Sequence, residues 1–303
     1  MTLVLVSPDR FVRHVPLGFA FRDASDLSLV GEELDVRIVD AALPLRNARL
    51  GPTPSGTWMT PRLPGLSMEL SEKPADWPAK ARTFHVAVDD PERRFLPIRF
   101  DAKLPARGRL QWPAWAGFDQ AKILPILPAG AAPGYKPDYL PLFPSIARTA
   151  PGPRATLRAQ LAERQADGTD KPAAWAVMTV TTKDKDPSKD KLIALGVAGA
   201  DGSIAACGAY PKLPGQEAAE AAKGRKQVIW DMEIAVYWDE LPGDPPDLAA
   251  ILGQLKSPVR VALAEFGKTD PLPVQKLILG HPLTLVTMKS AAERLSTLYL
   301  KPN

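Results

Sequence analysis

The histidines and the cysteine are the side chains best suited to catalysis or metal binding, and the chain has few of them. His14, His85 and His281 are its only histidines, and no two of them lie at a metal-ligand spacing. Cys207 is the single cysteine, which excludes an internal disulfide. It lies in an apolar run with no base nearby in sequence, so we interpret it as a small buried thiol in a strand. These residues indicate no catalytic, cofactor or metal site.

The motifs of common active sites point the same way. The chain contains no Gly-x-Ser-x-Gly, no His-Glu-x-x-His and no P-loop. Adjacent acids such as Asp89-Asp90 fall at predicted strand ends, where solvated loop carboxylates are usual. We therefore expect that the protein is not an enzyme. The alternative is a site assembled from distant residues, which predicts a pocket where one of the three histidines faces a carboxylate.

Two loops resemble ligand sites only superficially. The segment Lys183–Lys191 has acids at alternate positions, like the start of a calcium loop. Lys189 and Leu195, however, stand where that loop needs Gly and Glu, so we predict a solvated hairpin tip. The glycine-rich segment Gly196–Ser203 leads into a strand rather than a helix, which predicts a β-turn and not a phosphate cradle.

Composition favours a β-rich protein with a balanced surface charge. The 303 residues include 38 basic and 34 acidic side chains spread along the chain, a pattern that does not indicate nucleic-acid binding. The 33 prolines argue against a helical fold. The apolar start is too short for a signal peptide, and no apolar run is long enough to span a membrane. We expect a cytoplasmic protein, or a part of a particle assembled in the cytoplasm.

Period-2 hydrophobic runs predict strands throughout both halves of the chain. In the first half they are followed by a hairpin connection at 89–94. Helical patterns are fewer: 216–223 has high helix propensity without an apolar face, 247–255 has apolar residues at helical spacing, and 290–295 is a third short candidate. The predicted strands are 34–40, 84–88, 95–100, 155–161, 173–182, 192–198, 203–210, 227–238, 259–266, 283–288 and 298–300.

One pattern occurs twice: a strand, a proline with small residues, a glycine turn and a closing Pro-x-Leu-Pro-Gly. The copies close at Pro61–Gly65 and Pro211–Gly215. We interpret them as two β-sandwich modules of immunoglobulin-like or transthyretin-like type, at 1–110 and 154–303, with one or two short helices in the second. An ordered, extended proline-rich strap at 111–153 would join the modules.

The strap carries aromatic side chains that no strand alternation explains. For Trp112 and Trp115, the sequence favours two roles equally: docking inside the chain and contact with a partner. A carbohydrate-binding platform is the third option. By contrast, Trp58, Trp175 and Trp230 are predicted to be core residues. The interface candidates of the strap are Trp112, Trp115, Phe118, Tyr135, Tyr139 and Phe143.

Two resemblances add a functional expectation. Pro172-Ala-Ala-Trp-Ala176, the turn at 196–205 and Tyr210-Pro211 are similar to the carboxypeptidase regulatory-like, transthyretin-like β-sandwich. Phe84–Pro97 with its following sandwich resembles proteins encoded with phage-tail-like contractile injection systems. The resemblance implies a non-enzymatic baseplate-type or accessory part that contacts other protein subunits of a large assembly, with no cofactor and no small-molecule ligand. The alternative function is a carbohydrate- or polymer-binding module.

Overall fold

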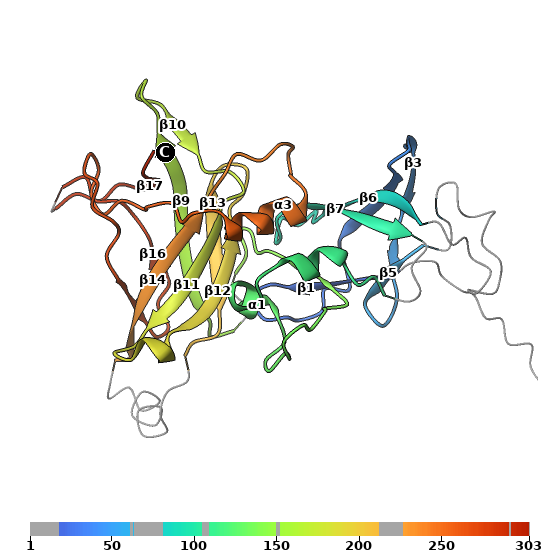
Figure 1. The fold of residues 1–303 in the computed structure, drawn as a ribbon, viewed down its shortest axis with the longest axis horizontal. Coiled ribbons are helices and arrows are strands. Elements are labelled where there is room, and N and C mark those ends of the chain that lie inside the picture. The colour runs from blue at the N-terminus through green and yellow to red at the C-terminus, as the bar shows by residue number, and fades with distance from the viewer. Residues whose placement is uncertain are drawn as a thin grey trace, which may run out of the picture.

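The fold is mainly β, as the sequence predicts, and its strands form three sheets (Figure 1). The computed structural model describes residues 18–60, 63, 81–104, 109–149, 152–211, 227–290 and 292–302. His14, the predicted helix at 216–223 and most of both closing Pro-Gly segments lie outside these ranges. In the part of the chain that is described, no helix has the length and apolarity needed to cross a membrane.

Two four-stranded sheets form the first half. One has the order β4-β5-β1-β8, in which β1 runs antiparallel to β5 and parallel to β8. The other has the order β3-β2-β6-β7 with antiparallel neighbours throughout. The strands are β1 Gly18–Asp23, β2 Asp35–Asp40, β3 Leu43–Arg49, β4 Gly51–Pro52, β5 Thr57–Met59, β6 Arg82–Asp89, β7 Ile98–Leu104 and β8 Leu140–Leu142.

Alternation in β6 and β7 produces one apolar and one polar sheet face. Along β7, every second side chain from Ile98 to Leu104 is buried, while Arg99, Asp101 and Lys103 are exposed. Successive strand residues point to opposite faces, so this pattern fixes which side of the sheet meets the core. On the buried side Phe100 meets Phe19 of β1 edge-to-face, with ring centroids 5.3 Å apart. The two small sheets therefore enclose a common core.

The second half forms one nine-stranded sheet with the order β10-β9-β13-β12-β11-β14-β15. Strands β16 and β17 both pair in parallel with β9. Because β16 also contacts β15, the sheet curls round a second core that includes Leu157, Met178 and Leu277. The strands are β9 Ala155–Arg164, β10 Asp170–Pro172, β11 Val177–Lys183, β12 Lys191–Val197, β13 Ser203–Gly208, β14 Ile229–Tyr237, β15 Gln275–Ile278, β16 Leu283–Thr284 and β17 Leu298–Leu300.

The α-helices of the described residues are short and lie between the small sheets and the large one (Figure 1). The α-helices are α1, Gln120–Ile123, and α3, Leu248–Gly253, where the sequence predicted a helix. Asp247 caps α3 by accepting a hydrogen bond from the amide of Ala249 at 2.7 Å. The 3-10 turns are η2 Pro113–Gly117, η3 Leu124–Ile126, η4 Pro187–Lys189 and η5 Gln254–Lys256.

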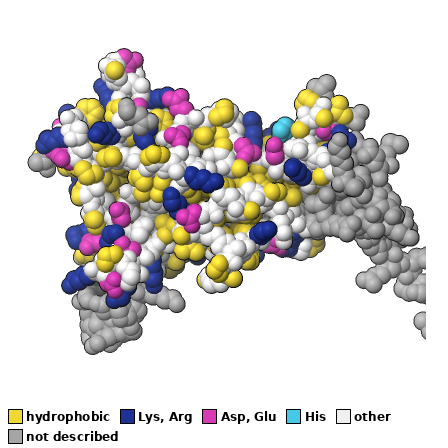
Figure 2. Space-filling model, viewed as in Figure 1, with side chains coloured by type: hydrophobic (Ala, Val, Ile, Leu, Met, Phe, Trp, Pro, Cys, Tyr) yellow, Lys and Arg dark blue, Asp and Glu magenta, His cyan; other side chains and the backbone are white. Residues whose placement is uncertain are grey.

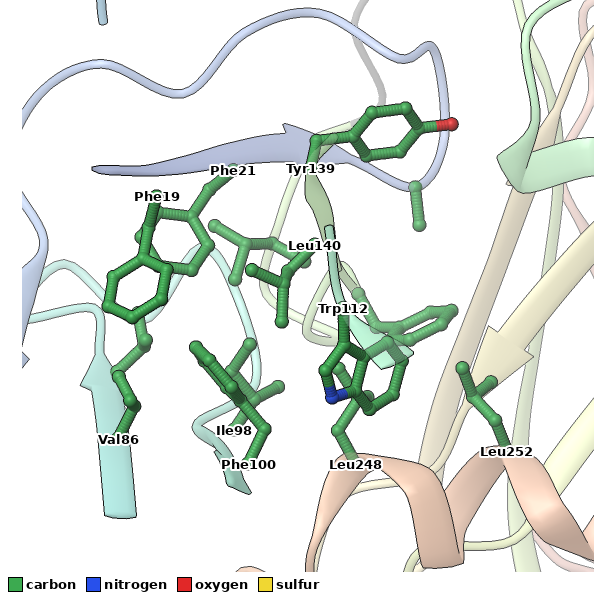
Figure 3. Close-up of a cluster of buried hydrophobic side chains, with 14 of the residues drawn as sticks. Phe19, Phe21, Val86, Ile98, Phe100, Trp112, Tyr139, Leu140, Leu248 and Leu252 are labelled. Atoms are coloured by element: carbon green, nitrogen blue, oxygen red, sulfur yellow. The ribbon is translucent and has the colours of Figure 1, made fainter. Parts of the chain in front are cut away.

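One continuous core connects the two halves of the fold. Figure 3 shows Trp112 beside Leu248 of α3, with Phe100 and Ile98 on its other side. Val177 of the large sheet belongs to the same buried cluster. The first half, the segment after it, α3 and one face of the large sheet thus pack together by hydrophobic burial, which is the main favourable term in folding.

Several finer expectations are not reproduced. Two tandem sandwiches are not confirmed, because the second half is a single curled sheet. The extended strap is not confirmed either: 113–126 forms short helices, and β8 joins the first sheet. Residues 259–266 make isolated bridges instead of a strand, and the described residues of 290–295 form no helix. The division at 110 and 153 stays a prediction.

Candidate functional site

A cleft of about 640 Å³ lies between the polar face of the β2-β6-β7 sheet and the proline-rich loop before α3. Its size is within the range of ligand pockets in proteins. The sheet supplies most of the polar groups, and the loop supplies a proline wall. The lining residues used below are Val39, His85, Ala87, Arg99, Asp101, Pro242, Pro245, Pro246 and Asp247.

Strand register brings the polar side chains of the cleft together. His85 stands opposite Val39 on one side and opposite Asp101 on the other. One step along the same face, Ala87 stands opposite Arg99. Directly opposed side chains in an antiparallel pair are close neighbours. The small Ala87 side chain therefore leaves a hollow bordered by larger groups.

His85 and Asp101 form a solvent-accessible hydrogen-bonded pair. Nδ1 of His85 lies 2.6 Å from Oδ1 of Asp101, and the two side chains are 60% and 58% exposed. An ionised carboxylate can only accept, so Nδ1 carries the proton and donates it. The structure thus contains the arrangement that a distant-residue enzyme site predicts, a histidine facing a carboxylate in a pocket. However, no hydroxyl, thiol or amine nucleophile is among the described residues that line the cleft.

Arg99 is the basic side chain of the cleft, and its donors are not engaged by any described residue. Within the described ranges it makes no ion pair, whereas Arg37 on the same sheet face pairs with Asp35 and Asp89. A guanidinium carries five donors in a planar fork that matches a carboxylate. The side chain of Arg99 is exposed, so it retains that capacity at the edge of the cleft.

Asp247 ties the proline loop to the edge of the sheet. The backbone of Asp247 forms an isolated parallel bridge with Arg99, and its carboxylate accepts a hydrogen bond from the amide of Ala249. The amides of Ala250 and Asp101 also act on the carboxylate and favour its charged form. Burial raises the pKa of Asp247. The amide hydrogen bonds oppose this, but the nearby charge of Asp101 raises the pKa further. The loop therefore covers part of the β7 edge, and the cleft lies over the face of the sheet.

We expect the substitution Asp247→Asn to stabilise the protein at neutral pH. Asn caps helices as well as Asp does, and it avoids the cost of a desolvated charge. The pKa of Asp247 is raised in the folded state, so its favourable contribution to the free energy of unfolding is complete below the ordinary pKa of 3.8. That contribution is lost as the pH rises through the folded-state pKa. The gain should be at most about 1 kcal/mol, the size of a single cap effect, and should disappear in acid.

Urea unfolding of the wild type and of Asp247→Asn, each at neutral pH and in acid, measures this difference in the free energy of unfolding. Asp119→Asn, at the corresponding cap of α1, is the matched control, since the side chain of Asp119 also accepts an amide hydrogen bond but is exposed. A less stable Asp247→Asn variant at neutral pH would show that the ionised carboxylate is worth more than its burial costs.

The predicted interface aromatics lie mostly inside the protein. Trp115 packs edge-to-face on Trp112 and donates from Nε1 to the carbonyl of Tyr139 at 3.2 Å. Four of the six candidates are at most 4% exposed: Trp112, Trp115, Tyr139 and Phe143. Phe118 is half-buried against the tryptophans, and Tyr135 is 36% exposed. A glycan platform needs exposed ring faces, and the two tryptophans do not provide them.

The other residues singled out from sequence lie away from the cleft, in the core or in exposed turns. Cys207 is buried in β13, where burial raises the pKa of its thiol. Trp58 and Trp175 are buried, but Trp175 lies before β11 in a left-handed conformation, and half-buried Trp230 stacks on Tyr210. His281 is in an exposed turn. Among the described residues, no group of three or more possible ligands could hold a metal ion.

Sequence reasoning missed Arg99, Asp101 and Asp247 as members of a site. The strand and hairpin predictions for 84–100 did not supply the register: counting opposed pairs outward from the connection at 89–94 sets His85 against Ile98, whereas the structure sets it against Asp101. The long connection leaves that count ambiguous. Nothing in the sequence indicates that the loop before α3 meets β7.

No protein-family model, no curated protein and no solved structure matches this chain. The site is therefore judged on its own geometry. The described side chains on the face in Figure 2 are a mixture of basic, acidic and apolar groups, with neither sign of charge gathered in one region.

Proposed function

We propose that the protein is a non-enzymatic component of a larger assembly. It holds a partner in the cleft between the β2-β6-β7 sheet and the proline-rich loop before α3. The observation that carries this proposal is the combination of an open apolar cleft with a free guanidinium, Arg99, and no nucleophile among its described lining residues. A His–carboxylate pair acts efficiently as a base when it is shielded from water and directed at a reacting group. His85 and Asp101 are both mostly exposed. Their geometry supports recognition better than catalysis.

The assembly we propose is a phage-tail-like contractile injection particle, in which the chain acts as a baseplate-type part. The support is the sequence resemblance of Phe84–Pro97. This segment also forms β6, which contributes His85 and Ala87 to the cleft. The rest of the fold supports a structural role, because one core fixes both halves in a single arrangement.

A large side chain placed in the cleft should prevent the partner from binding. We expect Ala87→Trp to fill the hollow between His85 and Arg99 and to abolish copurification of sheath, tube or baseplate chains from native lysate. Thr83→Trp is the matched control, since Thr83 lies on the same face of β6 outside the cleft lining. A wild-type protein that runs only as a free monomer would contradict the proposed assembly. Retention of the partner by Ala87→Trp would show that the cleft is not the contact.

A further inference from the structure

We propose that the cleft recognises the carboxylate of an acidic side chain in an extended apolar segment of a partner protein. This inference rests on the proposed function and specifies the chemistry of its partner. Three features of the described residues carry it: the free donors of Arg99, the second ring nitrogen of His85, and the apolar surface around them.

The first feature is that the carboxylates of the cleft have hydrogen-bond partners within the protein, whereas its guanidinium does not. Each carboxylate already has a donor: Asp101 accepts from His85, and Asp247 accepts from the amide of Ala249. In contrast, Arg99 has neither an ion pair nor a side-chain hydrogen bond with any described residue. The unmet capacity of the site is therefore a donor capacity, and a planar carboxylate matches it in two parallel hydrogen bonds.

His85 provides a second polar contact beside this guanidinium. Asp101 occupies Nδ1, so Nε2 is the ring nitrogen left for a ligand. When Nδ1 carries the single ring proton, Nε2 accepts, which suits a backbone N–H of the bound segment and not its carboxylate. Asp101 also fixes the orientation of the imidazole, as a carboxylate commonly does for a functional histidine. His85 and Arg99 lie diagonally across β6 and β7, on either side of the Ala87 position. A peptide segment above Ala87 could therefore place its acidic side chain on Arg99 and a backbone N–H on His85.

The apolar surroundings indicate what accompanies the carboxylate. Val39 and Ala87 form the apolar floor, and Pro242, Pro245 and Pro246 form the wall. Charged groups gain most from hydrogen bonds where neighbouring apolar atoms exclude water. The bridge between Arg99 and Asp247 also occupies part of the β7 edge, so an added strand is blocked there. We infer a peptide that lies across the sheet face and places an aliphatic residue or proline next to an acid.

The probe is a pair of peptides, acetyl-Pro-Leu-Glu-Pro-Leu-amide and the same peptide with Gln in place of Glu. Calorimetric titration of the full chain gives the affinities, and amide chemical shifts locate the site. We expect the Glu peptide to shift the amides of Ala87 and Arg99 and to bind roughly tenfold or more tightly than the Gln peptide, the factor expected for a hydrogen bond to a charged group. Arg99→Gln should remove that preference.

Lys103→Gln is the matched control, because Lys103 is the exposed base four residues beyond Arg99 on the same face of β7. It should leave the preference unchanged. Equal binding of both peptides at the cleft overturns carboxylate recognition while the proposed binding function stands. Equal shifts from free butyrate overturn the peptide assignment. Absence of shifts in the cleft with either peptide at millimolar concentration overturns the inference, while loss of copurified chains in Ala87→Trp would still support the assembly.

Discussion

Replacing Trp115 by alanine is expected to lower the free energy of unfolding by about 3–5 kcal/mol, the usual cost of truncating a buried aromatic residue. The side chain is 4% exposed and contacts the rings of Trp112, Phe118 and Tyr139. The substitution also removes the donor to the Tyr139 carbonyl, which would then be left without that partner in the core. Chemical denaturation followed by circular dichroism measures the loss.

Tyr135→Ala is the control, since this aromatic residue of the same segment is 36% exposed. It should change stability by less than about 1 kcal/mol, as surface substitutions usually do. The comparison separates two roles that sequence alone left equal. A Trp115→Ala protein of nearly normal stability that has lost a partner would mean that Trp115 serves an interface, contrary to its position in the structure.

Elements whose hydrophobic period is regular could be predicted from sequence. Strands β2, β6, β9 and β13 lie where period-2 runs indicated them, and α3 lies where an apolar stripe followed a proline pair. Segments that depend on distant partners could not be found this way. Strand β8 is only three residues long, and its identity comes from parallel pairing with β1. Trp112 likewise finds part of its environment only when Leu248 of α3 packs beside it (Figure 3).

The candidate site was less predictable than the fold because it depends on register and on a long-range contact. The period-2 run at 84–88 implies that His85 lies on the strand face opposite Phe84 and Val86, and the structure confirms that His85 is exposed. The run did not place Asp101 opposite, since a shift of one residue would reverse the faces. The bridge between Arg99 and Asp247 joins residues on different halves of the chain. Local residue patterns carry no information about such a contact.

The second large effect should come from Arg148, which pairs with Asp23 beneath the surface. The Asp23 side chain is 0% exposed and that of Arg148 is 17% exposed. Asp23 also accepts hydrogen bonds from the amide and hydroxyl of Ser25, at 2.8 and 2.7 Å. Arg148 lies over the ring of Phe95 at 4.2 Å. The pair thus fastens the chain after β8 to the end of β1 and to the residue that precedes β7.

Arg148→Ala is expected to cost about 3–5 kcal/mol, because it leaves the carboxylate of Asp23 buried without its counter-ion. Arg49→Ala is the matched control: Arg49 also pairs with an aspartate, Asp35, but its side chain is 77% exposed, and exposed pairs contribute about 0–1 kcal/mol. Urea unfolding of both variants tests the difference.

The double variant Asp23→Asn/Arg148→Gln distinguishes a lost contact from a stranded charge. If the penalty of Arg148→Ala comes mainly from the unpaired carboxylate, neutralising both partners should recover a large part of it, because neither remaining side chain carries a buried charge. If the double variant is as unstable as Arg148→Ala, the penalty lies in the lost packing of the guanidinium on Phe95. The pair would then stabilise the fold chiefly by shape rather than by charge.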